Sequence, residues 1–185
     1  LDAIGGSSAG VFVDARPRVA SLFRGISDSD FTEIISPMFI DVGKELGVPL
    51  SIINDGEVTA LAASMSLDEN AVLGIAMGTS EATGYVDTQG RVTSWLNELA
   101  FAPVDYSSNA PPDEWSGDVG CGVQYFSQQA VGRLIPKTDL SIDSNLGLPE
   151  KLELVQEFMA DGNEEAASIY RTIGTYLGYG VAHYA

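Results

Sequence analysis

Two polar residues, Asn54 and Asp55, stand between an apolar run at 49–53 and a helix-like stretch at 56–66. They place a carboxylate where a strand gives way to a helix. In an α/β protein the ligand crevice lies outside the carboxyl ends of the strands, so an acid at this point can meet a substrate hydroxyl and accept its proton. Asn and Asp also favour the N-cap of any helix, so the pair taken alone fits a structural cap equally well.

A second chemical signal lies one strand later. The apolar segment 72–77 runs into Gly78, Thr79 and Ser80, small residues whose backbone N–H groups can approach a phosphate. An acid at one strand end and a small-residue loop at the next predict phosphoryl transfer to an alcohol. A β-hairpin that binds no nucleotide is the alternative explanation of this loop.

The charge balance limits the partners. The chain has 185 residues, 45% of them hydrophobic, and its 9 basic and 26 acidic residues give a net charge of −17. This acidity argues against binding nucleic acid, although backbone amides, a helix N-terminus and Mg²⁺ can still hold ATP. No apolar run reaches the roughly 18 residues that cross a bilayer, and no signal peptide is indicated. We therefore expect a cytoplasmic protein with no membrane partner.

Metal-binding and redox side chains are few. Cys121 is the single cysteine and His183 the single histidine, so the chain can form neither an internal disulfide nor a cysteine-based zinc site. His183 falls in a helical pattern, where we expect a structural role. The chain begins at Leu1 in an apolar segment and stops at Ala185 inside a periodic helix, so we expect it to be the middle of a longer protein.

Hydrophobic spacing and turn residues predict an α/β protein with mixed sheets and flanking helices. The last helix carries one apolar stripe from Ala166 to Val181, which core packing explains. The best candidate hinge is the loop at 66–71. The elements expected are a β-hairpin within 1–23 with its turn at 15–17, a helix from 37 to 46, a strand from 49, a helix at 56–66, strands at 72–77, 82–87 and 91–95, a long loop at 103–118, and helices at 122–134, 149–160 and 163–184.

The order of these pieces resembles the ROK family of sugar kinases, within the actin-like ATPase superfamily. The stretch 6–14 is similar to a glycine-containing strand and turn of that family, 48–62 to its catalytic segment, and 77–80 to its second phosphate loop. The resemblance implies the actin-like ATPase (ribonuclease H-like) fold, with two lobes around a cleft. Residues 1–66 would then be the remainder of the N-terminal lobe with the catalytic Asp, and 67–185 part of the C-terminal lobe.

The resemblance also implies roles for the candidate residues. Asp55 would be the general base that takes the proton of a sugar hydroxyl as its oxygen attacks the γ-phosphorus of ATP. Asn54 would hold a neighbouring hydroxyl. Glu98, in a segment similar to the family's Gly-Glu-x-Gly-His motif, would bind others.

The implied cofactors are ATP and Mg²⁺, with the nucleotide phosphates held by Gly78, Thr79 and Ser80. The family's first phosphate loop and its late adenosine-binding segment are not in this chain. We therefore expect the chain alone not to turn over ATP. A homodimer is a further implication of the resemblance.

The resemblance fails at the family's zinc motif. Phe101 stands where relatives carry a histidine, and Glu114 and Ser116 stand where two cysteines would be. Because only Cys121 remains of four ligands, we expect no zinc. Aromatic packing should hold this region instead, through Trp115, Tyr125 and Phe126.

Further departures affect the sugar and the nucleotide. Phe101 and Val123 replace side chains that contact the sugar in relatives, which argues against glucose and favours a different or less hydroxylated sugar. Glu81 follows the phosphate loop, and its charge would repel a triphosphate unless it points away or meets Mg²⁺.

The prediction for the longer protein is therefore ATP-dependent phosphorylation of a sugar hydroxyl. Two alternatives stay open. The departures at Glu81, Phe101 and Val123 fit a non-catalytic sugar-binding or regulatory protein, and the acidic surface with its long loop fits a protein-interaction module.

Overall fold

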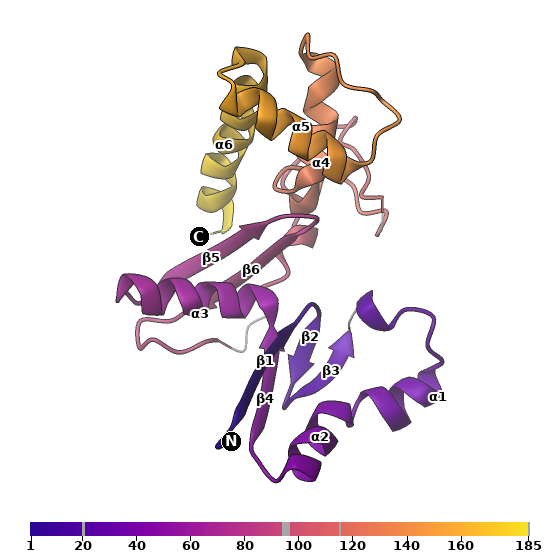
Figure 1. The fold of residues 1–185 in the computed structure, drawn as a ribbon, viewed down its shortest axis with the longest axis vertical. Coiled ribbons are helices and arrows are strands. Elements are labelled where there is room, and N and C mark those ends of the chain that lie inside the picture. The colour runs from indigo at the N-terminus through magenta and orange to yellow at the C-terminus, as the bar shows by residue number, and fades with distance from the viewer. Residues whose placement is uncertain (20, 94–96, 115, 185) are drawn as a thin grey trace. The chain divides into compact units, whose positions relative to one another are not determined.

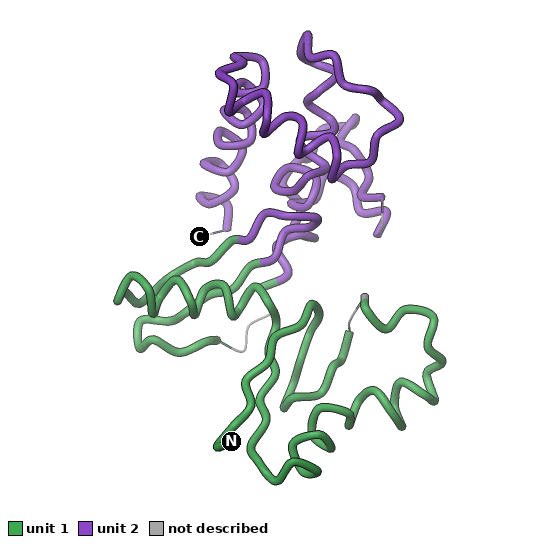
Figure 2. The backbone as a smooth tube through the Cα atoms, in the orientation of Figure 1, with its two compact units in different colours: residues 1–75, 83–97 green, residues 76–82, 98–185 purple. Residues whose placement is uncertain are grey.

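The computed structural model describes residues 1–19, 21–93, 97–114 and 116–184, and the chain divides into two compact units. Unit 1 comprises residues 1–75 and 83–97, and unit 2 comprises residues 76–82 and 98–185 (Figure 2). The described strands form three two-stranded sheets with helices beside them. The predicted α/β class is confirmed, whereas the predicted mixed sheets are not formed by the described residues, because each sheet holds a single strand pair.

Unit 1 is built on a parallel pair of strands, β1 (Ile4–Ser8) and β4 (Leu50–Asn54) (Figure 1). Ile4 pairs with Leu50, and the register continues to Ser8 opposite Asn54. Because the strands run in the same direction, their carboxyl ends meet at one edge of the sheet. This edge presents the segment that follows Asn54.

The predicted N-terminal hairpin is confirmed with two corrections, one to its strands and one to its turn. Its strands are β2 (Val11–Val13) and β3 (Arg16–Val19), whereas β1 is a separate strand. The turn lies at Asp14 and Ala15, whose φ angles are 52° and 58°, and not at the proline. Positive φ at both turn residues matches the twist of a two-residue hairpin. Pro17 lies inside β3, which an edge strand tolerates.

A helical region that the sequence analysis does not predict follows this hairpin. After a short 3₁₀ helix η1 (Ser21–Phe23), the chain forms α1 (Asp28–Asp30) and a π-helical turn η2 (Phe31–Ile35). The Ser27 side chain caps α1 by accepting from the Asp30 N–H at 3.1 Å. The residues before Phe31 alternate between Ser and Asp, so they show no apolar period that would predict a helix. Helix α1 starts because Ser27 caps it.

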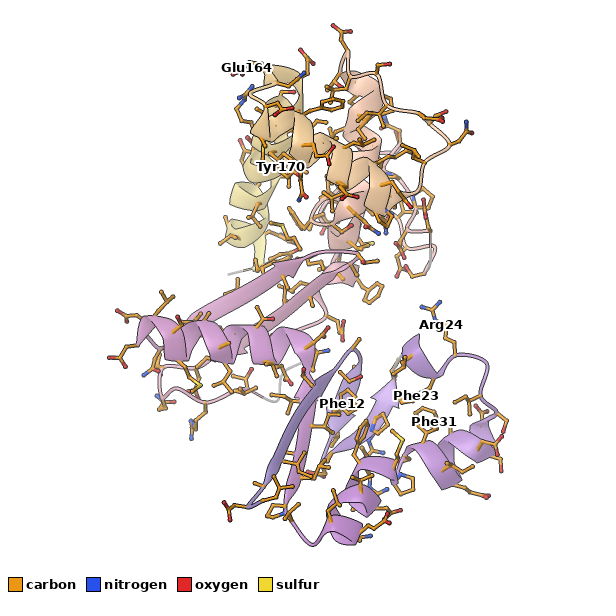
Figure 3. The ribbon with its side chains drawn as sticks, in the orientation of Figure 1. Phe12, Phe23, Arg24, Phe31, Glu164 and Tyr170 are labelled. Atoms are coloured by element: carbon orange, nitrogen blue, oxygen red, sulfur yellow. The ribbon has the colours of Figure 1, made fainter. Side chains whose placement is uncertain are left out.

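Aromatic pairs hold this region together. Phe23 and Phe31 lie edge to face with ring centroids 6.3 Å apart (Figure 3). Phe12 of β2 makes a similar pair, at 6.0 Å, with Phe39 of α2 (Met38–Leu46). Helix α2 corresponds to the helix predicted from 37 to 46. Gly47 ends it in a left-handed conformation with φ of 68°.

Helix α3 (Asp55–Leu67) approaches the hairpin of β5 (Val72–Met77) and β6 (Glu81–Val86) through glycines. A Cβ on Gly84 would lie 2.4 Å from the carbonyl oxygen of Gly56. A Cβ on Gly74 would likewise lie 2.6 Å from the Cα of Ala60. The backbone of the hairpin touches the backbone of α3 at these two points, so only glycine fits at positions 74 and 84.

The predicted third strand at 91–95 is not formed by the described residues. Val92 makes one isolated bridge to Val86, and residues 94–96, with Trp95, lie outside the described part of the chain. A turn follows β6 and is held by Asp87, whose Oδ1 accepts from the N–H groups of Gln89 at 2.8 Å and Arg91 at 2.9 Å.

Three helices form the main core of unit 2: α4 (Gln128–Leu134), α5 (Leu148–Ala160) and α6 (Glu164–Tyr184). Shorter 3₁₀ helices are η3 (Leu99–Phe101), η4 (Gly122–Gln124) and η5 (Ile135–Lys137). The helices pack around a cluster of buried residues: Ala130, Val131, Leu134, Ile135, Val155, Ala166, Ile169 and Ile173.

Two helix predictions in unit 2 need correction. The stretch 122–134 is divided into η4 and α4, because Ser127 has an extended conformation and caps α4 by accepting from the Gln129 N–H at 3.1 Å. The apolar stripe of α6 is buried only in its first half, since Val181 is 40% exposed. Within the described residues, no helix has the length and apolarity needed to span a lipid bilayer.

Candidate functional site

Asn54 holds the junction between β4 and α3 in place. Its backbone is still extended, and its side-chain Oδ1 accepts from the Gly56 N–H at 2.8 Å. Its Nδ2 donates to the Gly10 carbonyl at 2.7 Å, which ties the loop after β1 to the end of β4. Asn54 is thus a helix cap in this structure, and one Nδ2 hydrogen remains for a ligand.

Glu57 completes a capping box at this junction. Its Oε2 accepts from the backbone N–H of Asn54 at 3.1 Å, so two N–H groups at the start of α3 are satisfied by side chains. Partial burial raises the pKa of Glu57, and the bond from Asn54 opposes this rise. The box leaves Asp55 as the carboxylate of this junction that is not needed for the cap.

Asp55 is the first residue of α3, and its side chain is exposed. It stands directly beyond the edge where the parallel strands β1 and β4 end. The only described bond of its side chain is a weak one at 3.1 Å, in which Oδ1 shares the Gly56 N–H with Asn54. A carboxylate in this position is accessible.

The loop of Gly78, Thr79 and Ser80 joins β5 to β6 and is exposed. The Gly78 N–H donates to the Ser80 carbonyl at 2.9 Å, and the Gly78 carbonyl accepts from the Gln128 N–H at 2.9 Å. A Cβ on Gly78 would meet no atom within 4 Å. This open approach to an anchored backbone fits the binding of a phosphate group.

Glu98 lies in unit 2, where it precedes η3. Its carbonyl accepts from the Phe101 N–H at 3.1 Å, and its side chain is half-buried. Of the candidate residues, Asn54 and Asp55 therefore adjoin each other in unit 1. The predicted phosphate loop, residues 78–80, and Glu98 belong to unit 2.

Glu81 is a buried acid next to the phosphate loop, and only 4% of its surface is exposed. The sequence shows that an acid follows this loop but does not predict that the acid is buried. The signal that could indicate it is the alternation along β6, which buries Glu81 together with Thr83. Burial raises the pKa of Glu81 to about 7, against the opposing hydrogen bond from Tyr184. The acid is thus partly neutral at physiological pH.

A polar turn organises the loop around Asp113. Asp113 is 4% exposed, and its carboxylate accepts from the Ser116 N–H at 2.7 Å and from Nε2 of Gln129 at 3.1 Å. The Asp113 N–H donates to the Asp118 carbonyl at 2.8 Å. In the described part of the chain, no three His, Cys, Asp or Glu side chains are placed to bind a metal ion.

The packing predicted around this loop involves Tyr125 and Phe126, while Trp115 lies outside the described residues. Phe126 is 1% exposed and packs on α6, where a Cβ on Gly180 would be 2.7 Å from its ring. Tyr125 donates a hydrogen bond to Asp105, and the Arg133 guanidinium stands 4.6 Å from the centre of its ring. Polar contacts therefore supplement the aromatic packing.

The chain is similar in structure to proteins of the ROK family. It matches the ROK hexokinase from Thermus thermophilus at 19% identity and a TM-score of 0.60, over 80% of this chain and 49% of that one. It matches a ROK family transcriptional regulator, a homolog of the E. coli MLC protein, at 18% identity and a TM-score of 0.66, over 98% and 46%. It matches a ROK family glucokinase from Streptomyces griseus, in complex with glucose and AMPPNP, at 20% identity and a TM-score of 0.57, over 82% and 53%.

The chain spans about half the length of these structures. No protein-family model matches it, and no curated protein sequence does. The similarity to the kinases and the similarity to the regulator are both similarities of fold.

Proposed function

We propose that this chain, which has the ROK fold, belongs to an ATP-dependent sugar kinase of the ROK family with two lobes around a cleft. The observation that carries the proposal is the accessible carboxylate of Asp55, placed at the carboxyl edge of a parallel strand pair and not needed for the helix cap. Since Asn54 and Glu57 complete the cap, the structural explanation of the Asn-Asp pair accounts for Asn54 but not for Asp55.

In this proposal Asp55 accepts the proton of a sugar hydroxyl while the hydroxyl oxygen attacks the γ-phosphorus of ATP. A bond forms between that oxygen and phosphorus, the bond to the bridging oxygen breaks, and ADP leaves with the electron pair. Mg²⁺ neutralises the charge on the phosphates. Asn54 offers its remaining amide hydrogen to a second hydroxyl, and Glu98 binds others.

The nucleotide phosphates lie against Gly78, Thr79 and Ser80, where the backbone is open to approach. Phe101 and Val123 replace polar sugar contacts of the family, so the sugar is less hydroxylated than glucose or differently substituted. The protein is expected to act in the cytoplasm as a homodimer and without zinc.

A kinase assay on the full-length protein tests this proposal with a panel of hexoses and amino sugars. We expect ATP-dependent phosphorylation of at least one sugar and a loss of kcat of about 10²–10⁴-fold in Asp55→Asn. Glu45→Gln is the matched control, because it removes an exposed carboxylate of α2 in the same unit. No turnover with any sugar, or full activity of Asp55→Asn, would contradict the proposal.

A regulatory sugar-binding protein is the second candidate. It is favoured by the match to a ROK transcriptional regulator, which covers 98% of this chain. Calorimetry distinguishes the two functions, since a regulator of this kind binds a sugar without binding ATP and Mg²⁺, whereas a kinase binds both.

A further inference from the structure

The Glu81 carboxyl group lies close to two other oxygen atoms within unit 2. Three oxygens surround the point where a Cβ on Gly122 would lie: Oε2 of Glu81 at 2.4 Å, the Leu99 carbonyl oxygen at 2.5 Å and the Tyr184 hydroxyl at 2.8 Å. The absence of a side chain at Gly122 makes room for this arrangement. Residues from β6, η3, η4 and α6 thus meet at one buried carboxyl group.

The hydrogen bonds of this group are incomplete for an ionised acid. The Tyr184 hydroxyl donates to Oε1 of Glu81 at 3.4 Å, a long bond. No described residue donates to Oε2, although this atom is buried. The neighbouring Leu99 carbonyl oxygen is an acceptor, so an ionised Oε2 would face a like partial charge, whereas a protonated Oε2 can donate toward it.

The other titratable groups around the Glu81 carboxyl group do not stabilise its ionised form. They are the Tyr184 phenol from α6 and the Cys121 thiol before η4, and the pKa of each is raised, chiefly by burial. The carboxylates of Asp113 and Asp118 act on Cys121 from the loop beyond it. Among the ion pairs of the described residues, none involves Glu81.

We propose that Glu81 is a positioning residue of the phosphate loop that acts as a neutral acid: protonated, it anchors the end of the loop to η3 and α6, and ionised, it weakens nucleotide binding. Glu81 directly follows Ser80, so its ionisation places a buried negative charge beside the predicted phosphate site. Such a charge is little screened by salt. The inference rests on the proposed function, because it assumes that nucleotide phosphates lie at this loop.

The first experiment measures the affinity of the full-length protein for AMPPNP with Mg²⁺ by calorimetry at pH 6 and pH 8. For the unmodified protein we expect the affinity to fall by about fivefold between these pH values, which is part of a full effect of about tenfold between the protonated and the ionised acid. Glu81→Gln, which resembles the neutral acid, should bind tightly at both. Any protonation of the nucleotide itself acts equally on both proteins. Glu157→Gln removes an exposed carboxylate of α5 and should behave like the unmodified protein.

The second experiment follows the titration of the Glu81 carboxyl group directly. The Glu81 carboxyl ¹³C resonance, assigned by its loss in Glu81→Gln, should titrate near pH 7 in the free protein. Because linkage is reciprocal, a tenfold effect on affinity requires saturating AMPPNP to raise this pKa by about one unit.

The outcomes separate the two proposals. An equal pH dependence of affinity in Glu81→Gln and the unmodified protein, or a Glu81 pKa that AMPPNP does not move, overturns the role of Glu81 and leaves the kinase proposal intact. If AMPPNP binds neither at pH 6 nor at pH 8, both proposals are overturned.

Discussion

At the scale of single residues, Asn54 and Asp55 divide two tasks between them. Asn54 caps α3 and ties it to Gly10, whereas Asp55 carries the accessible charge. Substitutions at these neighbouring positions should therefore have different effects. Asp55 should matter for turnover and little for stability, and Asn54 should matter for both.

The capping role of Asn54 can be measured by urea unfolding. Asn54→Ala should lower the free energy of unfolding by about 1–2 kcal/mol, because it removes both the cap and the bond to Gly10. Asn54→Ser keeps a capping oxygen but is too short to reach Gly10, so about half of the loss should return. Equal losses in the two variants would mean that the cap contributes little.

Glu81 should make stability depend on pH. Its pKa is raised to about 7 in the folded protein, above the value near 4.3 of an unperturbed Glu. Between these values the folded state holds a proton that the unfolded state has lost, so stability falls as pH rises and levels off above pH 7. The fall attributable to Glu81 should be on the order of 3 kcal/mol between pH 4.5 and pH 8, because each unit of pKa difference corresponds to about 1.4 kcal/mol. Denaturant midpoints from pH 4.5 to pH 8 should show a shallower slope in Glu81→Gln than in the unmodified protein.

At the scale of elements, the contact of α3 with the β5–β6 hairpin depends on bare backbone. Gly84→Ala should lower the free energy of unfolding by about 2–3 kcal/mol, because its Cβ would lie 2.4 Å from the Gly56 carbonyl oxygen. Gly78→Ala is the matched control, since its Cβ meets nothing within 4 Å, and its change should stay within about 0.5 kcal/mol. Thermal unfolding of the two variants would contradict this account if their losses were similar.

The loop around Asp113 should be stable without metal. A strong zinc chelator should leave the melting temperature unchanged, because hydrogen bonds to the Asp113 carboxylate hold the turn. Asp113→Ala should cost about 2–3 kcal/mol, since it leaves the donors from Ser116 and Gln129 unpaired. Asp118→Ala, at an exposed position in the same loop, is the control. A chelator-induced fall in melting temperature would show that a metal is bound after all.

At the scale of the whole molecule, the sequence predicts elements with a strong period and misses those set by single contacts. The α3 helix and β5 follow from apolar spacing and flanking residues, and the structure agrees to within about a residue. Helix α1 depends on the Ser27 cap in a polar stretch, and the burial of Glu81 depends on space left by Gly122. The Asp113 turn likewise depends on Gln129, which lies 16 residues away in the chain. Such long-range polar contacts have no periodic signature.

Because the net charge is −17, the free energy of unfolding should depend on the salt concentration. The ion pairs among the described residues lie at the surface: Lys44–Asp41, Arg91–Asp87 and Arg171–Glu164. Screening therefore removes little attraction, because exposed pairs contribute at most about 1 kcal/mol each, and it relieves much repulsion.

Raising NaCl from 10 mM to 300 mM at pH 7.5 should increase the free energy of unfolding by about 1–2 kcal/mol and the melting temperature by about 2–6 °C. The control is the same titration at pH 4.5, close to the isoelectric point of 4.1, where the net charge is small and the effect should nearly vanish. If the increase at pH 4.5 matched that at pH 7.5, salt would be acting on apolar burial and not on charge repulsion. Calorimetric melts at the two pH values decide between these causes.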